Sequence, residues 1–247
     1  MSTIERVIIT GASSGLGFAI AQRFLAEGSR VLINARDPGK LARAREQLGV
    51  DPRRVIAVAG DVGAPATAER LADTARTAFG GVDVLVNSAG IFGLTPFLDA
   101  TAAQLDAFYT TNVKGAYLLT QAVVRVMLEP RQEARRGCVI NLGTVMVEQP
   151  SAKLPCSAAM ASKGAVHALT RSLAIELAQH QIRVNAIAPG IIRTPLIGDA
   201  ADSLAGLHPL ARVGEPREIA DAALYLARAD FVTGTVLDVD GGYAHGR

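Results

Sequence analysis

The stretch RVIITGASSGLG, from Arg6 to Gly17, decides the fold because it reads as a strand, a tight turn and the start of a helix. Its apolar run is typical of a strand buried in a parallel sheet. Gly11 permits a tight turn, Gly15 lets backbone N–H groups approach an anion, and Gly17 lets the helix pack on the strand. A helix N-terminus at this point favours negative charge, which predicts a phosphate-binding turn of a dinucleotide site, although a plain loop between strand and helix has the same pattern. The expected phosphate contacts are Gly11, Ser13, Ser14, Gly15, Leu16 and Gly17.

Short runs rich in Val and Ile alternate with longer stretches of helical periodicity along the rest of the chain. The expected strands are RVIIT, SRVLIN, RVIAVA, VDVLVN, CVINL, IRVNAI and TVLDV. The expected helices are 15–27, 38–48, 65–79, 101–128, 157–180 and 216–229. Because strands and helices alternate, we predict a doubly wound Rossmann fold, an α/β domain over 1–247 with a seven-stranded parallel sheet and helices on both faces. Residues 191–213 lose this periodicity and predict a substrate-covering segment.

Composition and charge exclude several other classes of protein. The formal net charge is +2, and the densest basic stretch, 125–136, is interrupted by two glutamates, so we expect no nucleic-acid partner. The thiols Cys138 and Cys156 lack metal-type spacing and read as reduced, and no metal is expected. No apolar run is long enough for a membrane helix, and MSTIERVIIT reads as a strand instead of a signal peptide. We therefore expect a cytoplasmic protein without membrane contact.

The residues after the second and third strands bear on which dinucleotide binds. An NAD-binding protein usually places an acid after the second strand to accept the ribose hydroxyls, and Ala35 stands there instead. Arg36 offers a planar cation for a 2′-phosphate, so NADP(H) is favoured and NAD(H) is possible. A solvated loop residue is the alternative for Arg36. Asp61 is placed to accept from the adenine amino group or, equally well, to cap a turn.

Taken together, the motifs resemble those of the short-chain dehydrogenase/reductase family, in its compact single-domain branch. The likeness runs through TGASSGLG, Gly60-Asp61-Val62, Asn87-Ser88-Ala89-Gly90, Asn112 in TTNVKG, CVINL, Lys163 in ASKGAV, IRVNAIAPG with Thr194, and VDGG. It implies further cofactor contacts from Asp61, Val62, Asn87, Ala89, Gly90, Lys163, Pro189, Gly190, Ile192 and Thr194. It also implies reversible conversion of a ketone to a secondary alcohol, the activity of a carbonyl reductase.

In that family a Tyr, a Lys four residues later, a strand-end Ser and an Asn form the catalytic set. The Lys lowers the phenol pKa, the phenol passes a proton to the carbonyl oxygen, and the hydroxyl and Asn-held water stabilise the developing charge. Matched position by position, the Lys is Lys163, the Asn is Asn112 and the hydroxyl falls on Thr144. Gly143 stands where the family often has Ser, and the methyl of Thr144 restricts its rotamers.

The tyrosine position departs from the family, because Ala159 lies four residues before Lys163. No Tyr occurs between Tyr117 and Tyr225, so a small shift in alignment does not restore one. Alanine cannot donate a proton, and acid–base groups contribute about 10²–10⁴-fold to rate. The hypothesis is that Ala159 replaces a Tyr, by engineering or by loss, and that this form is inactive or weakened.

Nearby side chains offer weak substitutes for the missing acid. Tyr109 reads as a core residue sharing a helix face with Asn112, Ser157 as a helix cap, and Ser162 as packing beside Lys163. His167 reads as a helix-surface or interface residue. Cys156 also lies close in sequence.

The loop VMVEQPSAKLP, 145–155, is expected to border the substrate and is about two residues longer than is usual for the family. Met146 and Gln149 are the predicted substrate contacts, with Glu148 a further candidate. A solvated loop is the alternative.

Three functions therefore remain at this point. The first is an NADP-preferring oxidoreductase weakened by Ala159. The second is a catalytically silent dinucleotide-binding regulator or scaffold, and the third is a non-redox enzyme that uses Lys163 or Thr144. The resemblance further implies a homotetramer, for which small residues on the Lys163 helix would allow close packing.

Overall fold

The computed structural model describes residues 5–130, 137–198 and 201–245. Parts of three expectations lie outside the described residues: the start of MSTIERVIIT, the end of the basic stretch 125–136, and two residues of the segment 191–213. Within the described part of the chain, no helix has both the length and the apolar character that crossing a bilayer requires.

Seven parallel strands form one sheet in the order β3-β2-β1-β4-β5-β6-β7, which confirms the predicted doubly wound α/β fold. The strands are β1 Arg6–Ile9, β2 Arg30–Ala35, β3 Val55–Ala59, β4 Val84–Asn87, β5 Cys138–Leu142, β6 Arg183–Pro189 and β7 Val236–Val239. The α-helices are α1 Gly15–Ala26, α2 Pro38–Gln47, α3 Pro65–Phe79, α4 Ala102–Phe108, α5 Gly115–Met127, α6 Ser157–Glu176 and α7 Pro216–Arg228.

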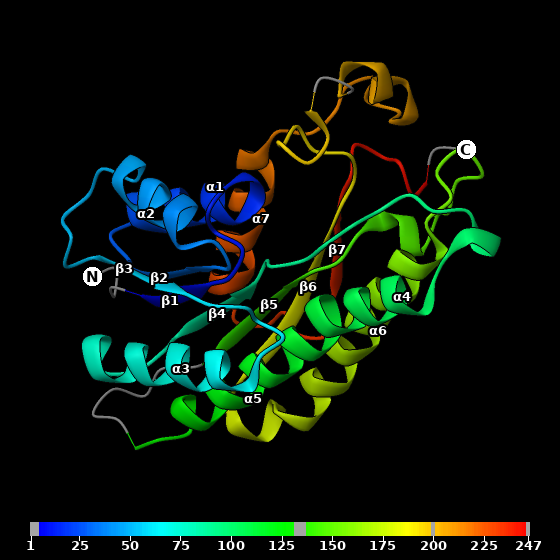
Figure 1. Cartoon of the computed structure of the whole chain (residues 1–247). Coiled ribbons are helices and arrows are strands. Elements are labelled where there is room, and N and C mark those ends of the chain that lie inside the picture. Colours follow the sequence, from blue (N-terminus) through cyan, green and yellow to red (C-terminus); the bar gives the residue numbers. More distant parts are fainter. Residues whose placement is uncertain (1–4, 131–136, 199–200, 246–247) are drawn as a thin grey trace.

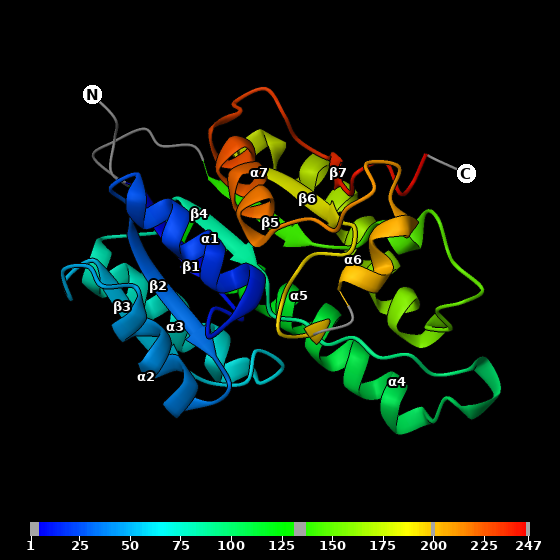
Figure 2. The same ribbon diagram turned by 90° about the horizontal axis from the view of Figure 1, so that it is seen from above.

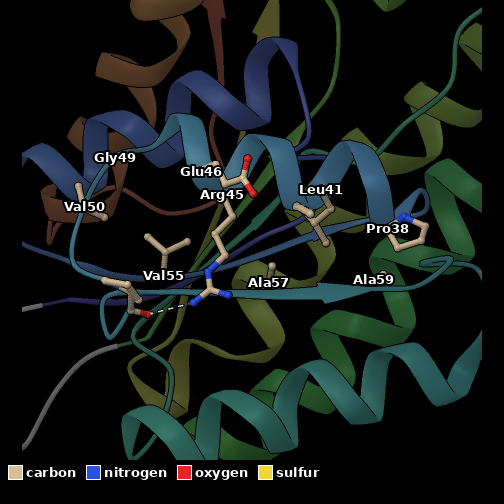
Figure 3. Close-up of a pocket in the computed structure, with 11 residues that line it drawn as sticks. Pro38, Leu41, Arg45, Glu46, Gly49, Val50, Val55, Ala57 and Ala59 are labelled. Atoms are coloured by element: carbon tan, nitrogen blue, oxygen red, sulfur yellow. Dashed lines mark hydrogen bonds between the residues drawn. The ribbon is translucent and has the colours of Figure 1, made fainter.

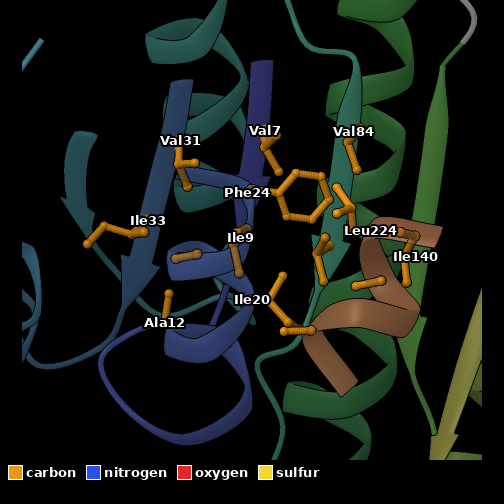
Figure 4. Packing of buried hydrophobic residues seen from close by; sticks show 14 of the residues in the cluster. Val7, Ile9, Ala12, Ile20, Phe24, Val31, Ile33, Val84, Ile140 and Leu224 are labelled. Carbon is orange, nitrogen blue, oxygen red and sulfur yellow. The ribbon is translucent and has the colours of Figure 1, made fainter. Parts of the chain in front are cut away.

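Two hydrophobic cores lie on opposite faces of the sheet, and helices cover both faces (Figure 1). Helices α1, α2 and α7 cover one face, where Phe24 and Ile20 of α1 pack between Val7 and Val84 of the strands and Leu224 of α7 (Figure 4). Helices α3, α5 and α6 cover the other face. The central strands are buried on both faces, which explains why their sequences are continuous apolar runs and do not alternate with polar residues.

The predicted helix 101–128 is two α-helices joined by a π-helical segment, Tyr109–Lys114. The wider winding of a π-helix shifts which residues share a face. As a result Asn112 is buried while Tyr109 is 40 % exposed, so the prediction that Tyr109 fills the core beside Asn112 is wrong. The predicted helix 157–180 ends at Glu176 and is followed by a short 3₁₀ turn.

The order of strands reverses between β1 and β4, because β2 and β3 extend the sheet to one side and β5 to β7 to the other. Parallel strands bring all their carboxyl ends to the same edge, and ligands of doubly wound sheets bind at the reversal point. In Figure 2 the segment 191–213 lies beyond that edge, near the start of α6.

Candidate functional site

The glycine turn packs directly against the chain that leaves β4. A Cβ added at Gly11 would lie 2.8 Å from the Cα of Ala89, and Gly11 has a φ of 65°. The hydroxyl oxygen of Thr10 accepts hydrogen bonds from the backbone N–H groups of Ser88 and Ala89, at 3.1 and 3.0 Å. Only glycine fits the first turn position, because both the backbone angle and the space exclude a side chain.

The rest of the turn leads directly into the N-terminus of α1. Helix α1 begins at Gly15, and the side chain of its N-cap Ser14 caps no backbone group. A Cβ added at Gly17 would lie 2.5 Å from the carbonyl oxygen of Gly11, so the helix sits on the turn itself. Thr194 lies over Gly15, since a Cβ there would be 3.7 Å from the Thr194 Cβ. Backbone N–H groups at a helix N-terminus that no side chain caps can hold a phosphate.

Arg36, Asp61 and Val62 are the residues predicted at the adenine end of the site. Arg36 is exposed directly after β2. The carboxylate of Asp61 accepts from the N–H of Gly63 at 2.9 Å, which is the turn role that the sequence left open. Val62 is 8 % exposed and packs against Gly115, where a Cβ would lie 2.8 Å from a Val62 methyl.

Lys163 and Asn112 meet at Gly90, although they lie on different helical segments. A Cβ added at Gly90 would lie 3.1 Å from the Lys163 Nζ and 3.2 Å from the Asn112 Oδ1. The Nζ of Lys163 donates to the carbonyl oxygen of Leu142 at 2.7 Å. Burial lowers the pKa of Lys163 to about 8. An amine that titrates near neutrality beside an amide oxygen is suited to proton transfer.

The side chain of Asn112 joins three parts of the site. Its Oδ1 accepts from the N–H of Ile91 at 2.8 Å, and its Nδ2 donates to the carbonyl oxygen of the same residue at 3.0 Å. Its Nδ2 also donates to the Ser162 Oγ at 2.9 Å, and that hydroxyl donates to the carbonyl oxygen of Ala159 at 2.7 Å. Ser162 thus bonds the Asn112 amide, a role beyond the packing predicted for it.

Thr144 stands two residues past the end of β5 and is half-buried. Its hydroxyl accepts from the N–H of Met146 at 3.3 Å and begins the 3₁₀ turn Val145–Val147. Met146 is 8 % exposed and Gln149 is half-buried on the same loop. The loop therefore lies beside the strand end from which the Thr144 hydroxyl projects.

Ala159 has no exposed surface. It belongs to an apolar cluster that also contains Phe108, Met146, Cys156 and Tyr243. The predicted cap role of Ser157 is wrong, because the N-cap is Cys156 and no side chain caps α6. The position that the family fills with a phenol is here covered by neighbouring side chains.

His167 is buried, and the prediction of a surface or interface position for it is wrong. It is 2 % exposed and lies against Gly143, where an added Cβ would be 2.1 Å from its Nε2. Its Nδ1 is 3.8 Å from a carboxylate oxygen of Glu148, and both ring nitrogens lack a hydrogen-bond partner. Burial lowers the His167 pKa, so the ring is neutral at pH 7. Gly143 is the signal in the sequence for this burial, because the absence of a side chain there leaves room for the His167 ring.

The side chain of Asn87 points away from the predicted cofactor site. Its Nδ2 donates to Thr120 Oγ1 at 3.0 Å and to Asn141 Oδ1 at 2.9 Å, inside the molecule. Asn141 in turn donates to Thr170 Oγ1 at 2.9 Å. This buried polar network joins β4 and β5 to α5 and α6, so the Nδ2 of Asn87 is engaged inside the molecule.

The segment from Pro189 to Thr194 is fixed by backbone contacts. The N–H of Gly190 donates to the carbonyl oxygen of Val239 at 3.1 Å, and the N–H of Ile191 donates to the His208 Nε2 at 3.1 Å. Ile192 is 5 % exposed and forms a β-bridge with Gly214. These contacts hold the segment at the carboxyl end of β6.

Two cavities are lined by at most one of the residues that the sequence predicts for the site. One, of about 540 Å³, lies between α2 and β3, and Arg45 crosses it to the carbonyl oxygen of Pro52 (Figure 3). The other, of about 290 Å³, lies behind Ile191 and Ile192 and is lined by His208 and Asp240. The first contains none of the predicted site residues, and the second contains only Ile192.

The protonation of Lys163 gives a testable dependence of stability on pH. Its folded-state pKa, about 8, lies below the ordinary value of 10.5. Between these pH values the unfolded chain binds more protons than the folded chain, so this residue makes the free energy of unfolding rise with pH. We expect that Lys163→Met removes this contribution, so that the native chain gains stability relative to the variant from pH 8 to 10.5 in urea unfolding.

The exposed Lys153 provides a control for this measurement. For Lys153→Met, the difference from the native chain should stay constant over the same pH range. Parallel curves for the native chain and Lys163→Met would contradict the lowered pKa.

Comparison with known proteins gives consistent matches over the whole length. Residues 11–244 match the family model described as enoyl-(acyl carrier protein) reductase. The galactitol 2-dehydrogenase (L-tagatose-forming) of Cereibacter sphaeroides is 39 % identical, over 95 % of this chain and 93 % of that protein.

Two solved structures superpose closely on this chain. A short-chain type dehydrogenase/reductase from Mycobacterium marinum superposes with a TM-score of 0.91 and 32 % identity, over 98 % of this chain and 96 % of the other. A 3-ketoacyl-(acyl-carrier-protein) reductase from Brucella melitensis, complexed with NADH, gives a TM-score of 0.90 and 32 % identity, over 97 % and 98 %.

Proposed function

Because the chain belongs to the short-chain dehydrogenase/reductase family of oxidoreductases, we propose that it binds NADP(H) at the carboxyl edge of its sheet and that its parent reaction interconverts a ketone and a secondary alcohol. The observation that supports this most directly is the meeting of Lys163 and Asn112 at Gly90, beside the glycine turn. The NADH in the Brucella melitensis relative supports a nicotinamide dinucleotide in general.

The residues present would fit such a cofactor at its pyrophosphate and at its nicotinamide. Gly11 and Gly15 keep side chains away from the turn, and the start of α1 supplies N–H groups for the pyrophosphate. When bound, the nicotinamide ring supplies or accepts the hydride. The Pro189–Thr194 segment would hold the nicotinamide end through its backbone, with Thr194 over Gly15 of the turn. Residues 191–213 would cover the substrate.

Each catalytic candidate has a distinct task in the proposed reaction. The Thr144 hydroxyl would donate a hydrogen bond to the substrate oxygen and so stabilise its developing negative charge. Lys163, whose pKa burial lowers to about 8, would hold and release a proton beside Asn112. Asn112 would keep its segment in place through its paired bonds to Ile91. The remaining task is to donate a proton directly to the substrate oxygen. The methyl group of Ala159 cannot do this.

We therefore propose that Ala159 weakens the reaction, whether the residue arose by engineering or by loss. The complete burial of Ala159 also favours a second candidate, a dinucleotide-binding protein without turnover that serves as a regulator or scaffold. A gain of rate on restoring a tyrosine separates the two candidates.

The preference for NADP(H) depends on Arg36. We expect Arg36→Ala to weaken NADPH binding about tenfold or more, because a charge-assisted contact to the 2′-phosphate contributes about 1.5–3 kcal/mol. NADH affinity should stay within about twofold. Fluorescence titration of each nucleotide measures both constants.

Arg43→Ala, on the exposed face of α2, is the matched control and should leave both affinities unchanged. Equal losses for NADPH and NADH in Arg36→Ala would contradict a 2′-phosphate contact. Lack of any NADPH binding by the native chain would refute the proposed function itself.

We also propose self-association as a homotetramer. Ile175 of α6 and Tyr117 of α5 are 79 % and 49 % exposed, and small exposed residues such as Ala161 and Ala168 lie on α6. Exposed apolar side chains of this kind are stabilised when a second copy covers them.

A further inference from the structure

Around the proposed reaction centre, apolar side chains are buried and charged side chains are exposed. On the loop 145–155, Val145, Met146 and Leu154 belong to the cluster around Ala159. Glu148 and Lys153 of the same loop are exposed, and Glu148 lies on the side of His167. The loop therefore buries its apolar side chains around Ala159 and leaves these two charged side chains in solvent.

The wall that follows β4 is also apolar. Ile91 and Phe92 pack against the same cluster, and Phe108 at the end of α4 is one of its buried members. The N–H of Thr95 donates to the carbonyl oxygen of Pro155 at 2.7 Å. This bond fastens the wall after β4 to the loop 145–155, so the two form one continuous surface.

The segment 191–213 closes the cluster with an apolar side chain as well. Leu207 packs against the cluster. Two polar side chains of this segment are partly engaged elsewhere, since Asp202 pairs with Arg193 at 2.5 Å and the His208 Nε2 accepts from the N–H of Ile191.

Large apolar side chains continue outward along these segments. Five of them are more than half exposed: Leu94, Phe97, Leu98, Leu196 and Leu210. Single exposed apolar residues are common, but their concentration on the segments that border one site marks a surface for an apolar ligand.

From this arrangement, which rests on the proposed function, we infer that the substrate is an apolar ketone or secondary alcohol, whose carbon next to oxygen is attached to alkyl or ring groups. A polyol would bury several hydroxyl groups against hydrocarbon, and each unpaired buried hydroxyl is costly. The substrate class therefore differs from the one that the name of the galactitol relative indicates.

A homologous series of ketones tests this inference in the native chain. The chain is first saturated with NADPH, and 2-butanone, 2-hexanone, 2-octanone and 2-decanone are then titrated, with binding followed by calorimetry. We expect the dissociation constant to fall about threefold to fourfold for each added methylene, because each buried methylene contributes a transfer free energy of that size. Fructose, a ketone with several hydroxyl groups, should bind no more tightly than 2-butanone.

Two methionine variants provide the matched comparison. Met146→Gln changes the cluster at the site, and Met127→Gln makes the same change at a partly buried position packed against the core beneath α3 and α5. The dependence on chain length should flatten in Met146→Gln and persist in Met127→Gln. A flat series in the native chain, or tighter binding of fructose than of 2-hexanone, would overturn the inference. Failure of the chain to hold NADPH, measured before any ketone is added, would instead overturn the proposed function.

Discussion

Ala159→Tyr is expected to raise the rate of NADPH-dependent ketone reduction about 10²–10⁴-fold, the usual contribution of a positioned acid–base group. The new phenol would lie one helical turn before Lys163, and a neighbouring ammonium lowers the pKa of a phenol. NADPH absorbance followed against a panel of ketones measures the gain.

The burial of Ala159 adds a structural cost to this gain. Its methyl group is fully covered, so the ring must displace Met146 or other members of the cluster. Inserting atoms into a packed site usually costs about 1–3 kcal/mol. We expect the variant to be more active and less stable than the native chain.

Two variants isolate the hydroxyl group in this experiment. Ala159→Phe introduces the ring without the acid, and Ala161→Tyr places the same residue on the exposed side of the same helix. Neither should raise the rate. An unchanged rate in Ala159→Tyr, with NADPH still bound, would refute the hypothesis of a missing tyrosine and favour the dinucleotide-binding protein without turnover.

Gly143→Ala is expected to be among the most destabilising single-methyl additions in this chain. The added Cβ would lie 2.1 Å from the Nε2 of His167, a distance that real atoms do not adopt. Since both groups are buried, the strand end or α6 must shift, and we expect a loss of about 3 kcal/mol or slightly more in the free energy of unfolding. Urea unfolding at pH 7 measures this loss.

Gly164→Ala is the control, because its nearest neighbour, a Val147 methyl, would be 3.7 Å away. This variant should be more stable than the native chain by about 0.5–1 kcal/mol, since alanine favours the helix. Adding His167→Ala to Gly143→Ala should recover part of the lost stability. A loss below about 0.5 kcal/mol in Gly143→Ala alone would show that His167 moves freely.

The order of helices and strands follows from the sequence because buried parallel strands have an unbroken apolar pattern that helices lack. The glycine turn was equally readable, since Gly11 is required by both backbone angle and space. The positions of Asn112 and Lys163 could be inferred from the family pattern. The structure adds that they meet at Gly90.

The errors have a common physical cause, which is that the neighbours of a residue were not known. A regular helix places Tyr109 with Asn112, but the π-helical segment rotates them apart. His167 looked like a surface residue because the space for its ring comes from a glycine more than twenty positions away.

Two hydrogen bonds connect the side chain of Asn112 to the backbone of Ile91. One amide group satisfies both the N–H and the carbonyl of the Ile91 peptide, as a neighbouring strand would. Asn112 therefore holds the chain that leaves β4 as a neighbouring strand would. The same amide also bonds Ser162 on α6. Displacing the chain that leaves β4 would therefore break both of its hydrogen bonds to Asn112 at once.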